Sequence, residues 1–322
     1  MPKAVITDYA FDDVQIERGI LEPLGCTLEA QKSGKDPATL AALVRDADYV
    51  LTQFAPVNAA IIAAMQRCKV IVRYGIGVDN VDLKAAAARG IPVCNVPDFC
   101  TDEVADHTVA MILDLCRRIT ENALKIRRGE WGLGVPLAAM RSLKDLTVGI
   151  VAYGRIGREV ALRLKPFKCR LIAFDPAVDA AKLKADGVEA VGLDQLYARS
   201  DLITLHCPST EATRFMINAS SIAKMKKGVL FVNVARGTLV RTDDLAAALR
   251  SGAVAGAALD VTDPEPINPD NPIVGMPNVL INAHIASASP QAVVKLRNDA
   301  AGIVRAVIKG EKLTTVVNGV TA

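Results

Sequence analysis

Short runs of apolar, often β-branched residues alternate with longer stretches of helical periodicity along most of the chain. Runs of this kind indicate strands that are buried on both faces, and a helix between two of them indicates a parallel crossover. One set of runs precedes residue 97, and a second set lies between residues 143 and 286. The sequence therefore predicts an α/β protein with two Rossmann-like, doubly wound parallel-sheet domains and a cleft between them.

Composition narrows the class of protein. The 322 residues are 51% hydrophobic and 23% charged, with a formal net charge of +3, which predicts globular domains with large cores. The near-neutral charge predicts no binding to nucleic acid or membrane, and no apolar stretch is long enough for a spanning helix. The seven cysteines lack CxxC spacing and are expected to be reduced thiols of a cytoplasmic protein. No cluster of ligand residues predicts a metal site.

A glycine-containing turn follows the first strand of the second set. The predicted strand 147–151 leads into Ala152-Tyr153-Gly154-Arg155-Ile156-Gly157 and a helical pattern, and Asp175 ends the next strand. This matches the dinucleotide-binding fingerprint, in which helix-start N–H groups face the pyrophosphate. Gly154 would permit close approach of the backbone, and Gly157 would permit tight packing of the helix. Asp175 would accept hydrogen bonds from ribose hydroxyls and repel a 2′-phosphate, which favours NAD over NADP.

The first position of this fingerprint is Ala152 rather than glycine. If the turn requires a positive φ at that position, alanine costs of the order of 1 kcal/mol. If φ stays negative, the cost does not arise. The sequence leaves both conformations open.

Three ionisable residues follow apolar runs in the second half of the chain: Arg236, Glu265 and His284. Ligands of open parallel sheets bind beyond the carboxyl ends of the strands, so these side chains are predicted to share one site. His284 suits a proton donor or acceptor near neutral pH, and Glu265 would orient its ring. Arg236 offers a planar fork to a carboxylate. The three together suit the reduction of a 2-keto acid.

Other polar residues near predicted strand ends have a structural and a functional interpretation. His107, inside a predicted helix, is expected to be structural. His206 is expected to be a hydrogen-bonded core residue, with the adenine side of the cofactor as the alternative. For Asp260, the two predicted alternatives are binding of the nicotinamide half of the cofactor and capping of local backbone. The turn at Ile76-Gly77, after a strand of the first set, offers N–H donors to a substrate carboxylate.

Two long helices are predicted in addition to those of the crossovers. One extends from 101 to 128, with an N-capping threonine and two acidic residues in its first turn. The other extends from 289 to about 308, and we expect it to return to the first sheet. The predicted domains are a flavodoxin-like substrate-binding domain, residues 1–98 and 289–322, and an NAD-binding Rossmann domain that includes the first long helix, residues 99–288.

Several stretches of the sequence resemble the D-isomer specific 2-hydroxyacid dehydrogenase family, in its branch of phosphoglycerate dehydrogenases and C-terminal-binding-protein corepressors. They occur in the family's order and cover nearly the whole chain. The stretches are Arg73–Asp82, Asn95–Pro97, Val151–Gly157, Leu205–Pro208, Asn233–Gly237, Ala258–Val261 with Pro264–Pro266, and Asn282–Ala286.

The resemblance implies roles for particular residues. It implies that Arg236, Glu265 and His284 form the catalytic set. The predicted substrate-binding residues are Ile76, Gly77, Arg236 and His284. It also implies that NAD contacts several strand ends. Together with the fingerprint residues and their neighbours, the predicted cofactor-binding residues are Gly154, Arg155, Ile156, Gly157, Asp175, Pro176, His206, Cys207, Pro208, Val234, Ala235, Arg236, Asp260 and His284.

The resemblance further implies a homodimer built through the region 101–140, and hinges near 97–100 and 286–290. The predicted function is that of an NAD-dependent oxidoreductase, which transfers a hydride between NAD(H) and a D-2-hydroxy acid or 2-keto acid. The alternative is a corepressor-like binding protein that senses NAD(H) and has weak or no dehydrogenase activity.

Overall fold

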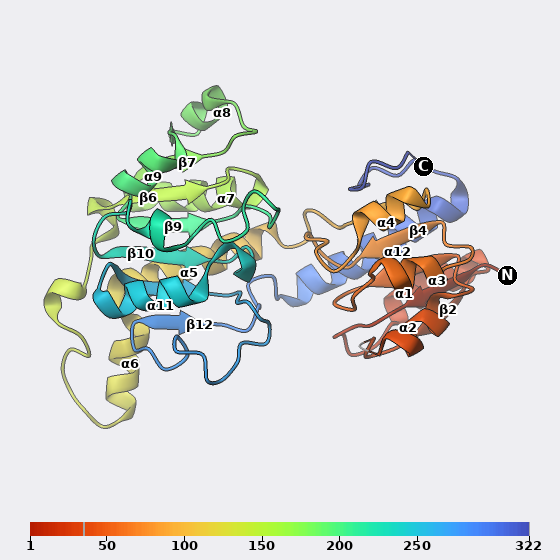
Figure 1. Ribbon diagram of the computed structural model, residues 1–322, viewed down its shortest axis with the longest axis horizontal. Helices are drawn as coiled ribbons and strands as arrows, with labels where there is room; N and C mark the ends of the chain where they lie inside the picture. Colours follow the sequence, from red (N-terminus) through yellow and green to blue (C-terminus); the bar gives the residue numbers. More distant parts are fainter. Residues whose placement is uncertain (35, 322) are drawn as a thin grey trace. The chain divides into compact units, whose positions relative to one another are not determined.

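The computed structural model describes residues 1–34 and 36–321. The chain divides into two compact units, Met1–Phe99 with Ser289–Ala322 and Cys100–Ala288. Each unit contains one parallel sheet with its own helices (Figure 1). The predicted architecture of two α/β, Rossmann-like units is therefore confirmed. The unit bounds differ by one residue from the predicted domain boundaries, and the roles given to the two domains stay predictions.

The first unit contains a five-stranded sheet in the order β2-β1-β3-β4-β5. This is the flavodoxin-like strand order, and every pairing in the sheet is parallel. The edge strand β2 was not predicted, because it is short and half exposed. The strands are β1 (Lys3–Ile6), β2 (Thr27–Ala30), β3 (Tyr49–Thr52), β4 (Val70–Arg73) and β5 (Val93–Cys94).

Helices cover the sheet of the first unit, and several begin at a capping side chain. The oxygens of Asp36, Asn58, Asp82 and Ser289 accept N–H groups of the following first turns. The last helix, α12, returns to this unit as expected and buries Leu296 in the same core as β1 and β4; in Figure 1 it lies in blue beside the red and orange elements. The helices are α1 (Gln15–Leu21), α2 (Pro37–Val44), α3 (Ala59–Ala64), α4 (Leu83–Ala88) and α12 (Pro290–Lys309).

The second unit contains a seven-stranded parallel sheet in the order β12-β11-β10-β9-β6-β7-β8. Strand β6 carries the glycine turn and lies between β7 and β9, so the strand order reverses beside it. The strands are β6 (Thr147–Val151), β7 (Arg170–Phe174), β8 (Glu189–Ala190), β9 (Leu202–Leu205), β10 (Val229–Asn233), β11 (Val254–Leu259) and β12 (Val279–Ile281).

The helices of the second unit correct two predictions: the expected helix 101–128 is two helices, and Thr101 is the first residue of the first of them instead of its N-cap. The chain breaks at Arg118, which adopts a left-handed φ of 54°. Its buried guanidinium donates to the Ala255 carbonyl at 3.1 Å and to Glu121 at 3.0 Å, and these bonds stabilise the break. The helices are α5 (Thr101–Arg117), α6 (Ile119–Arg127), α7 (Arg155–Leu164), α8 (Ala180–Ala185), α9 (Leu193–Arg199), α10 (Ala219–Ile222) and α11 (Thr242–Ser251).

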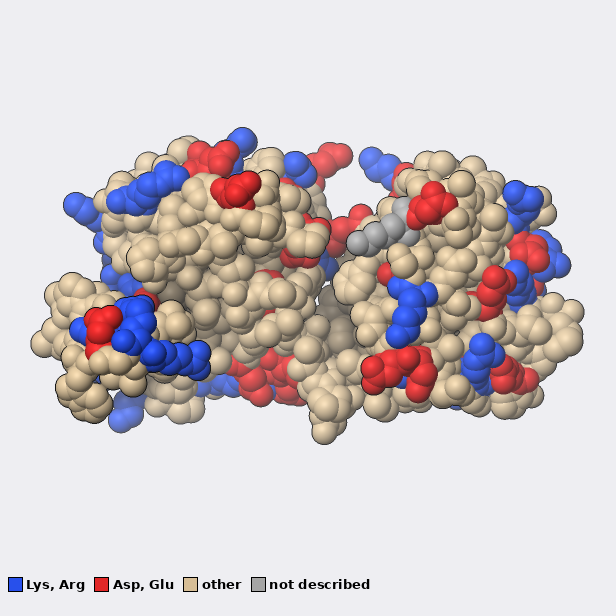
Figure 2. All heavy atoms as spheres, turned by 90° about the horizontal axis from the view of Figure 1, so that it is seen from below, with Lys and Arg blue, Asp and Glu red and all other residues tan. Residues whose placement is uncertain are grey.

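The described residues also show the character of the helices, the cysteines and the charged surface. Among the helices of residues 1–34 and 36–321, none combines the length and apolar character needed to cross a bilayer. The seven cysteines are free thiols, and the described residues contain no group of three or more His, Cys, Asp or Glu side chains placed to hold a metal ion. On the face drawn in Figure 2, basic and acidic side chains occur in small groups of opposite sign close to each other.

Candidate active site

The three predicted catalytic residues follow three adjacent strands. Strands β10, β11 and β12 are neighbours in the sheet, and all run in the same direction. Arg236 lies three residues after β10, Glu265 follows β11, and His284 lies three residues after β12. The structure thus places all three at the carboxyl edge of one sheet, as the sequence predicted. Ligands of open α/β sheets bind at this edge.

The His284 ring is oriented by a carboxylate. Its Nδ1 lies 3.0 Å from Oε2 of Glu265, and both side chains are about 40% exposed, at 39% and 40%. Burial alone would raise the pKa of Glu265, but the hydrogen bond and charge of His284, the Thr262 N–H and the charge of Arg236 together outweigh that effect and leave this pKa below its ordinary value. Glu265 is therefore ionised at neutral pH. Its bond to Nδ1 leaves Nε2 as the ring nitrogen that is available to a substrate.

The backbone of His284 adopts a left-handed φ of 54°, a conformation that costs a non-glycine residue about 1–2 kcal/mol. Asp260, which is 1% exposed, holds this turn. Its carbonyl accepts the His284 N–H at 2.8 Å, and its two carboxylate oxygens accept the N–H groups of Ile285 and Ala286 at 2.9 Å each. The structure thus supports the capping interpretation of Asp260, while a contact with the cofactor stays a prediction.

Two residues that the sequence interpretation did not single out shape the turn of Arg236. The side chain of Asn233, fully buried, donates to the Arg236 carbonyl at 2.8 Å and accepts the Ala235 N–H at 3.0 Å. A Cβ atom on Gly237 would lie 1.9 Å from the Thr262 carbonyl oxygen, so only glycine permits this approach. Thr262 in turn donates its N–H to Glu265 at 3.1 Å. The signal for both residues was their place next to Arg236 in a family motif.

The glycine turn has the conformation that disfavours alanine. Ala152 adopts a φ of 72°, so the open question about this position is settled in favour of a positive φ. A Cβ atom on Gly157 would lie 2.2 Å from the Ala152 carbonyl oxygen, which agrees with its predicted packing role. Gly154 caps α7, and a Cβ atom there would meet no atom within 4 Å. The N-terminus of α7 therefore opens onto free space that suits an anionic group.

Asp175 lies beside this turn, at the end of β7. Its Oδ2 accepts the Tyr153 N–H at 2.7 Å, and its Oδ1 accepts the Ala177 N–H at 2.8 Å. The Tyr153 ring is buried, and its hydroxyl contacts Asp186 at 3.2 Å. These bonds fix the carboxylate next to the turn, where a ribose of a bound dinucleotide is expected.

The strained turn gives a stability prediction. Ala152→Gly is expected to raise the free energy of unfolding by roughly 0.5–1 kcal/mol, since relief of about 1–2 kcal/mol of strain exceeds the entropic cost of glycine. Urea denaturation followed by circular dichroism measures the difference. Ala247→Gly, at an exposed position in α11, is the matched control and should lower stability by about 1 kcal/mol. A loss of stability in both variants would contradict the strain at residue 152.

The other predicted cofactor residues follow neighbouring strands. His206 and Cys207 follow β9, and the His206 N–H donates to the Val151 carbonyl at 2.9 Å. The Nε2 atom of the His206 ring lies 3.0 Å from the Thr204 hydroxyl, but its buried Nδ1 has no hydrogen-bond partner among the described residues. The expectation of a fully hydrogen-bonded core histidine is therefore met by only one of the two ring nitrogens. Burial lowers the pKa of His206 to about 3 and raises that of Cys207 to about 11. Both side chains are therefore neutral at pH 7.

The remaining predicted residues are placed as follows. Pro176 directly follows Asp175 after β7, Pro208 follows Cys207, and Val234 and Ala235 directly follow β10. Because β10, β9, β6 and β7 are consecutive in the sheet, all of these residues lie at one continuous edge.

The predicted substrate turn belongs to the first unit. It follows β4, and its backbone carbonyls are held from residues after β5. The Ile76 carbonyl accepts the Asn95 side-chain amide at 2.7 Å, and the Gly75 carbonyl accepts the Val96 N–H at 3.0 Å.

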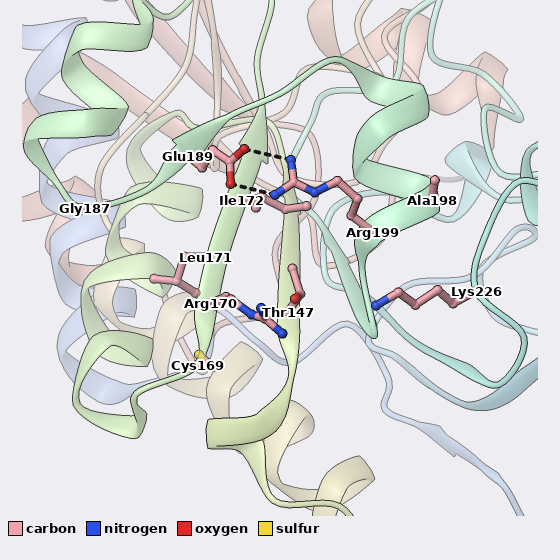
Figure 3. A pocket seen from close by; sticks show the side chains of 10 residues that line it. All are labelled: Thr147, Cys169, Arg170, Leu171, Ile172, Gly187, Glu189, Ala198, Arg199 and Lys226. Carbon is pink, nitrogen blue, oxygen red and sulfur yellow. Dashed lines mark hydrogen bonds and ion pairs between the residues drawn. The ribbon is translucent and has the colours of Figure 1, made fainter.

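A hollow of about 530 Å³ lies at the opposite edge of the second sheet (Figure 3). It is lined by Thr147 and Arg170, the first residues of β6 and β7, and by an ion pair in which the two terminal guanidinium nitrogens of Arg199 donate to Glu189 at 2.7 Å each. This edge carries the amino ends of the strands. The hollow is therefore separate from the candidate site.

Comparison with known proteins bears on this geometry. Residues 109–286 match the family model described as "D-isomer specific 2-hydroxyacid dehydrogenase, NAD binding domain", which confirms NAD as the cofactor of this domain family. The chain is 35% identical over 320 residues to a D-3-phosphoglycerate dehydrogenase of Mycobacterium leprae, covering 99% of this chain and 59% of that protein. It is 37% identical over 281 residues to a glyoxylate reductase of Thermofilum pendens, covering 85% of this chain and 82% of that protein.

A solved structure agrees with these matches. The crystal structure of D-lactate dehydrogenase from Aquifex aeolicus, complexed with NAD and lactic acid, aligns with a TM-score of 0.87 and 28% identity over 96% of each chain. The chain spans about half the length of the phosphoglycerate dehydrogenases that it matches, between 44% and 59% in three of them. The matched model and the relative that aligns over nearly the whole chain show that this protein belongs to the D-isomer specific 2-hydroxyacid dehydrogenase family.

Proposed function

We propose that the protein is an NAD-dependent oxidoreductase that transfers a hydride between NAD(H) and a D-2-hydroxy acid or 2-keto acid. The observation that carries this proposal is the hydrogen bond of 3.0 Å between Glu265 and Nδ1 of His284, which leaves Nε2 available for proton transfer. The relatives named above are described as dehydrogenases or a reductase, which favours an enzyme over an NAD(H)-sensing binding protein.

In the proposed mechanism, His284 moves the proton. In the reducing direction, its Nε2–H donates to the carbonyl oxygen of the 2-keto acid, and in the oxidising direction Nε2 accepts the hydroxyl proton. The Glu265 carboxylate keeps the ring in one orientation and stabilises the imidazolium form. Arg236 binds the substrate carboxylate through its planar guanidinium, and its positive charge also lowers the pKa of Glu265.

The cofactor, when bound, supplies or accepts the hydride. The residues around the glycine turn fit it, because the N-terminus of α7 at Gly154 opens onto free space and Asp175 lies beside it. We propose that Arg155 and Ile156 contribute helix-start N–H groups to the pyrophosphate. Asp175 would accept the ribose hydroxyls and disfavour the 2′-phosphate of NADP. The residues after β9 and β10 would line the path between the two halves of the dinucleotide.

We propose that Ile76 and Gly77 offer further N–H donors to the substrate carboxylate. Their N–H groups belong to a turn whose carbonyls are already bonded to Asn95 and Val96. Donors at a turn of this kind suit an anion.

The direct test is a panel of 2-keto acids assayed with NADH and NADPH in parallel, comparing the wild type with Arg236→Lys. Lysine keeps the charge but loses the bidentate fork, so kcat/KM for the best acid is expected to fall by about 10–100-fold, mainly through KM. Arg241→Lys, an exposed arginine in the same segment, is the matched control and should behave as the wild type. Absence of NADH oxidation with every acid would overturn the proposed function.

We also propose a homodimer formed through α6 and the segment that follows it. Six large apolar side chains there are exposed, and Trp131 is 93% exposed, which is costly in water unless a partner covers them. They are Ile119, Leu124, Ile126, Trp131, Leu133 and Leu137. Analytical ultracentrifugation should give twice the chain mass, and Leu124→Glu with Ile126→Glu should give monomers. A wild-type monomer at micromolar concentration would refute the dimer.

The cytoplasmic location stays a prediction.

A further inference from the structure

His107, a residue predicted to be structural, lies close to two residues that support the strained His284 turn, Asn282 and Asp260. It lies on α5, and its side chain is about one-fifth exposed, at 21%. Its Nε2 is 2.9 Å from Nδ2 of Asn282 and 3.7 Å from Oδ1 of Asp260.

Asn282 and Asp260 are the two residues that connect the His284 turn to the sheet. The Asn282 N–H donates to the Leu259 carbonyl at 2.8 Å, immediately before the turn. Asp260 accepts the N–H groups of the turn itself through its carbonyl and both carboxylate oxygens. A change in the orientation of the Asp260 side chain therefore alters the backbone that carries His284, and the backbone of Asn282 joins that turn two residues before His284.

We propose that His107 is a positioning residue for His284, an inference that rests on the proposed function. The amide nitrogen of Asn282 is a donor, so Nε2 of His107 accepts its hydrogen bond when the ring is neutral. This bond fixes the Asn282 side chain between α5 and the strand end. The same ring lies against Asp260 and limits the movement of the carboxylate that holds Ile285 and Ala286.

The energetic reason for such a support is the left-handed backbone of His284. A conformation that costs about 1–2 kcal/mol persists only where surrounding contacts over-determine it. Asp260 accepts the three hydrogen bonds that hold the turn directly, and His107 packs from α5 against the Asp260 carboxylate and the Asn282 side chain. Displacement of a reacting group by about 1 Å is enough to lower a rate by about 100-fold.

The test combines turnover with hydrogen–deuterium exchange of the segment 283–288 in three variants. His107→Leu removes the acceptor, and we expect faster exchange in this segment and a kcat lower by about 10–100-fold, with KM for NADH unchanged. His107→Gln offers its Oε1 as an acceptor and should restore both properties toward the wild type. Asp106→Asn, next to it on α5 and paired with Arg163, is the matched control and should change neither.

The outcomes separate this proposal from the proposed function. Unchanged exchange in His107→Leu would overturn the positioning role, even if the enzyme is active. Equal acceleration in His107→Leu and Asp106→Asn would also overturn it, since a general loosening of α5 would then be the cause. If none of the 2-keto acids supports NADH oxidation by the wild type, the proposed function fails. The exchange measurements still decide whether His107 holds the turn.

Discussion

His284→Asn is expected to lower kcat for 2-keto acid reduction by about 10²–10⁴-fold, the range usual for loss of a general acid. Asparagine is the suitable replacement because it tolerates the left-handed φ of 54° better than other residues, so the backbone of the turn is preserved. The amide cannot donate a transferable proton. Stopped-flow measurement of NADH oxidation gives the rate, and fluorescence titration gives the NADH affinity, which should change by no more than a few-fold.

Glu265→Gln provides the companion measurement. Glutamine keeps the size of the side chain and its place near Nδ1, 3.0 Å away in the native chain, but it removes the negative charge. The kcat is expected to fall by about 10²-fold or more, since the ring loses both its fixed tautomer and the charge that stabilises the imidazolium. If His284→Asn and Glu265→Gln both turned over at wild-type rates, the acid/base assignment would have to be abandoned.

Gly237→Ala is expected to lower kcat/KM by at least about 100-fold, without any change in the ionisable residues. The added Cβ atom would lie 1.9 Å from the oxygen and 2.0 Å from the carbon of the Thr262 carbonyl. Both are backbone atoms, so the clash can be relieved only by moving the turn of Arg236 away from the turn that leads to Glu265. The guanidinium and the carboxylate then no longer hold their native separation.

The measurement for this variant is steady-state kinetics together with thermal unfolding. Gly275→Ala is the matched control in the same unit, because a Cβ atom there would meet nothing within 4 Å, and its kinetics should equal those of the wild type. Full activity of Gly237→Ala would mean that the two turns do not need their close approach. A folded but inactive variant would locate the effect in the site rather than in stability.

The positions of the three catalytic candidates were predictable because each follows a buried strand. In a parallel sheet, the residues that directly follow the buried strands share the carboxyl edge, and this does not depend on the conformation of the intervening segments. The contact between His284 and Glu265 is expected because an acid/base histidine needs a carboxylate to orient it. The distance between the two side chains depends on two loops, and no local sequence pattern specifies their conformation. For Asp260 the sequence allows two roles, since a carboxylate after a strand suits a ligand and a backbone cap equally well.

Other features escaped prediction for physical reasons. Strand β2 is short and at an edge, with only part of its length buried, so its apolar signal is weak. The break at Arg118 carries no glycine or proline, and the bonds that stabilise it reach Ala255, 137 residues away. The positive φ of Ala152 is likewise set by its tertiary surroundings, including the close approach of Gly157.

The order of the strands in the second unit sets a length. Neighbouring strands are about 4.8 Å apart, so the end of β6, with its glycine turn, lies roughly 14 Å across the sheet from the end of β11. Only the ends of β9 and β10 lie between them. The imidazole of His284 follows β12, which lies beyond β11, so a molecule that reaches it from the helix N-terminus must be elongated and must cross the ends of β9, β10 and β11. Any substitution that adds bulk after β9 or β10 would shorten the ligands that the sheet can accommodate, while leaving the proton-transfer pair untouched.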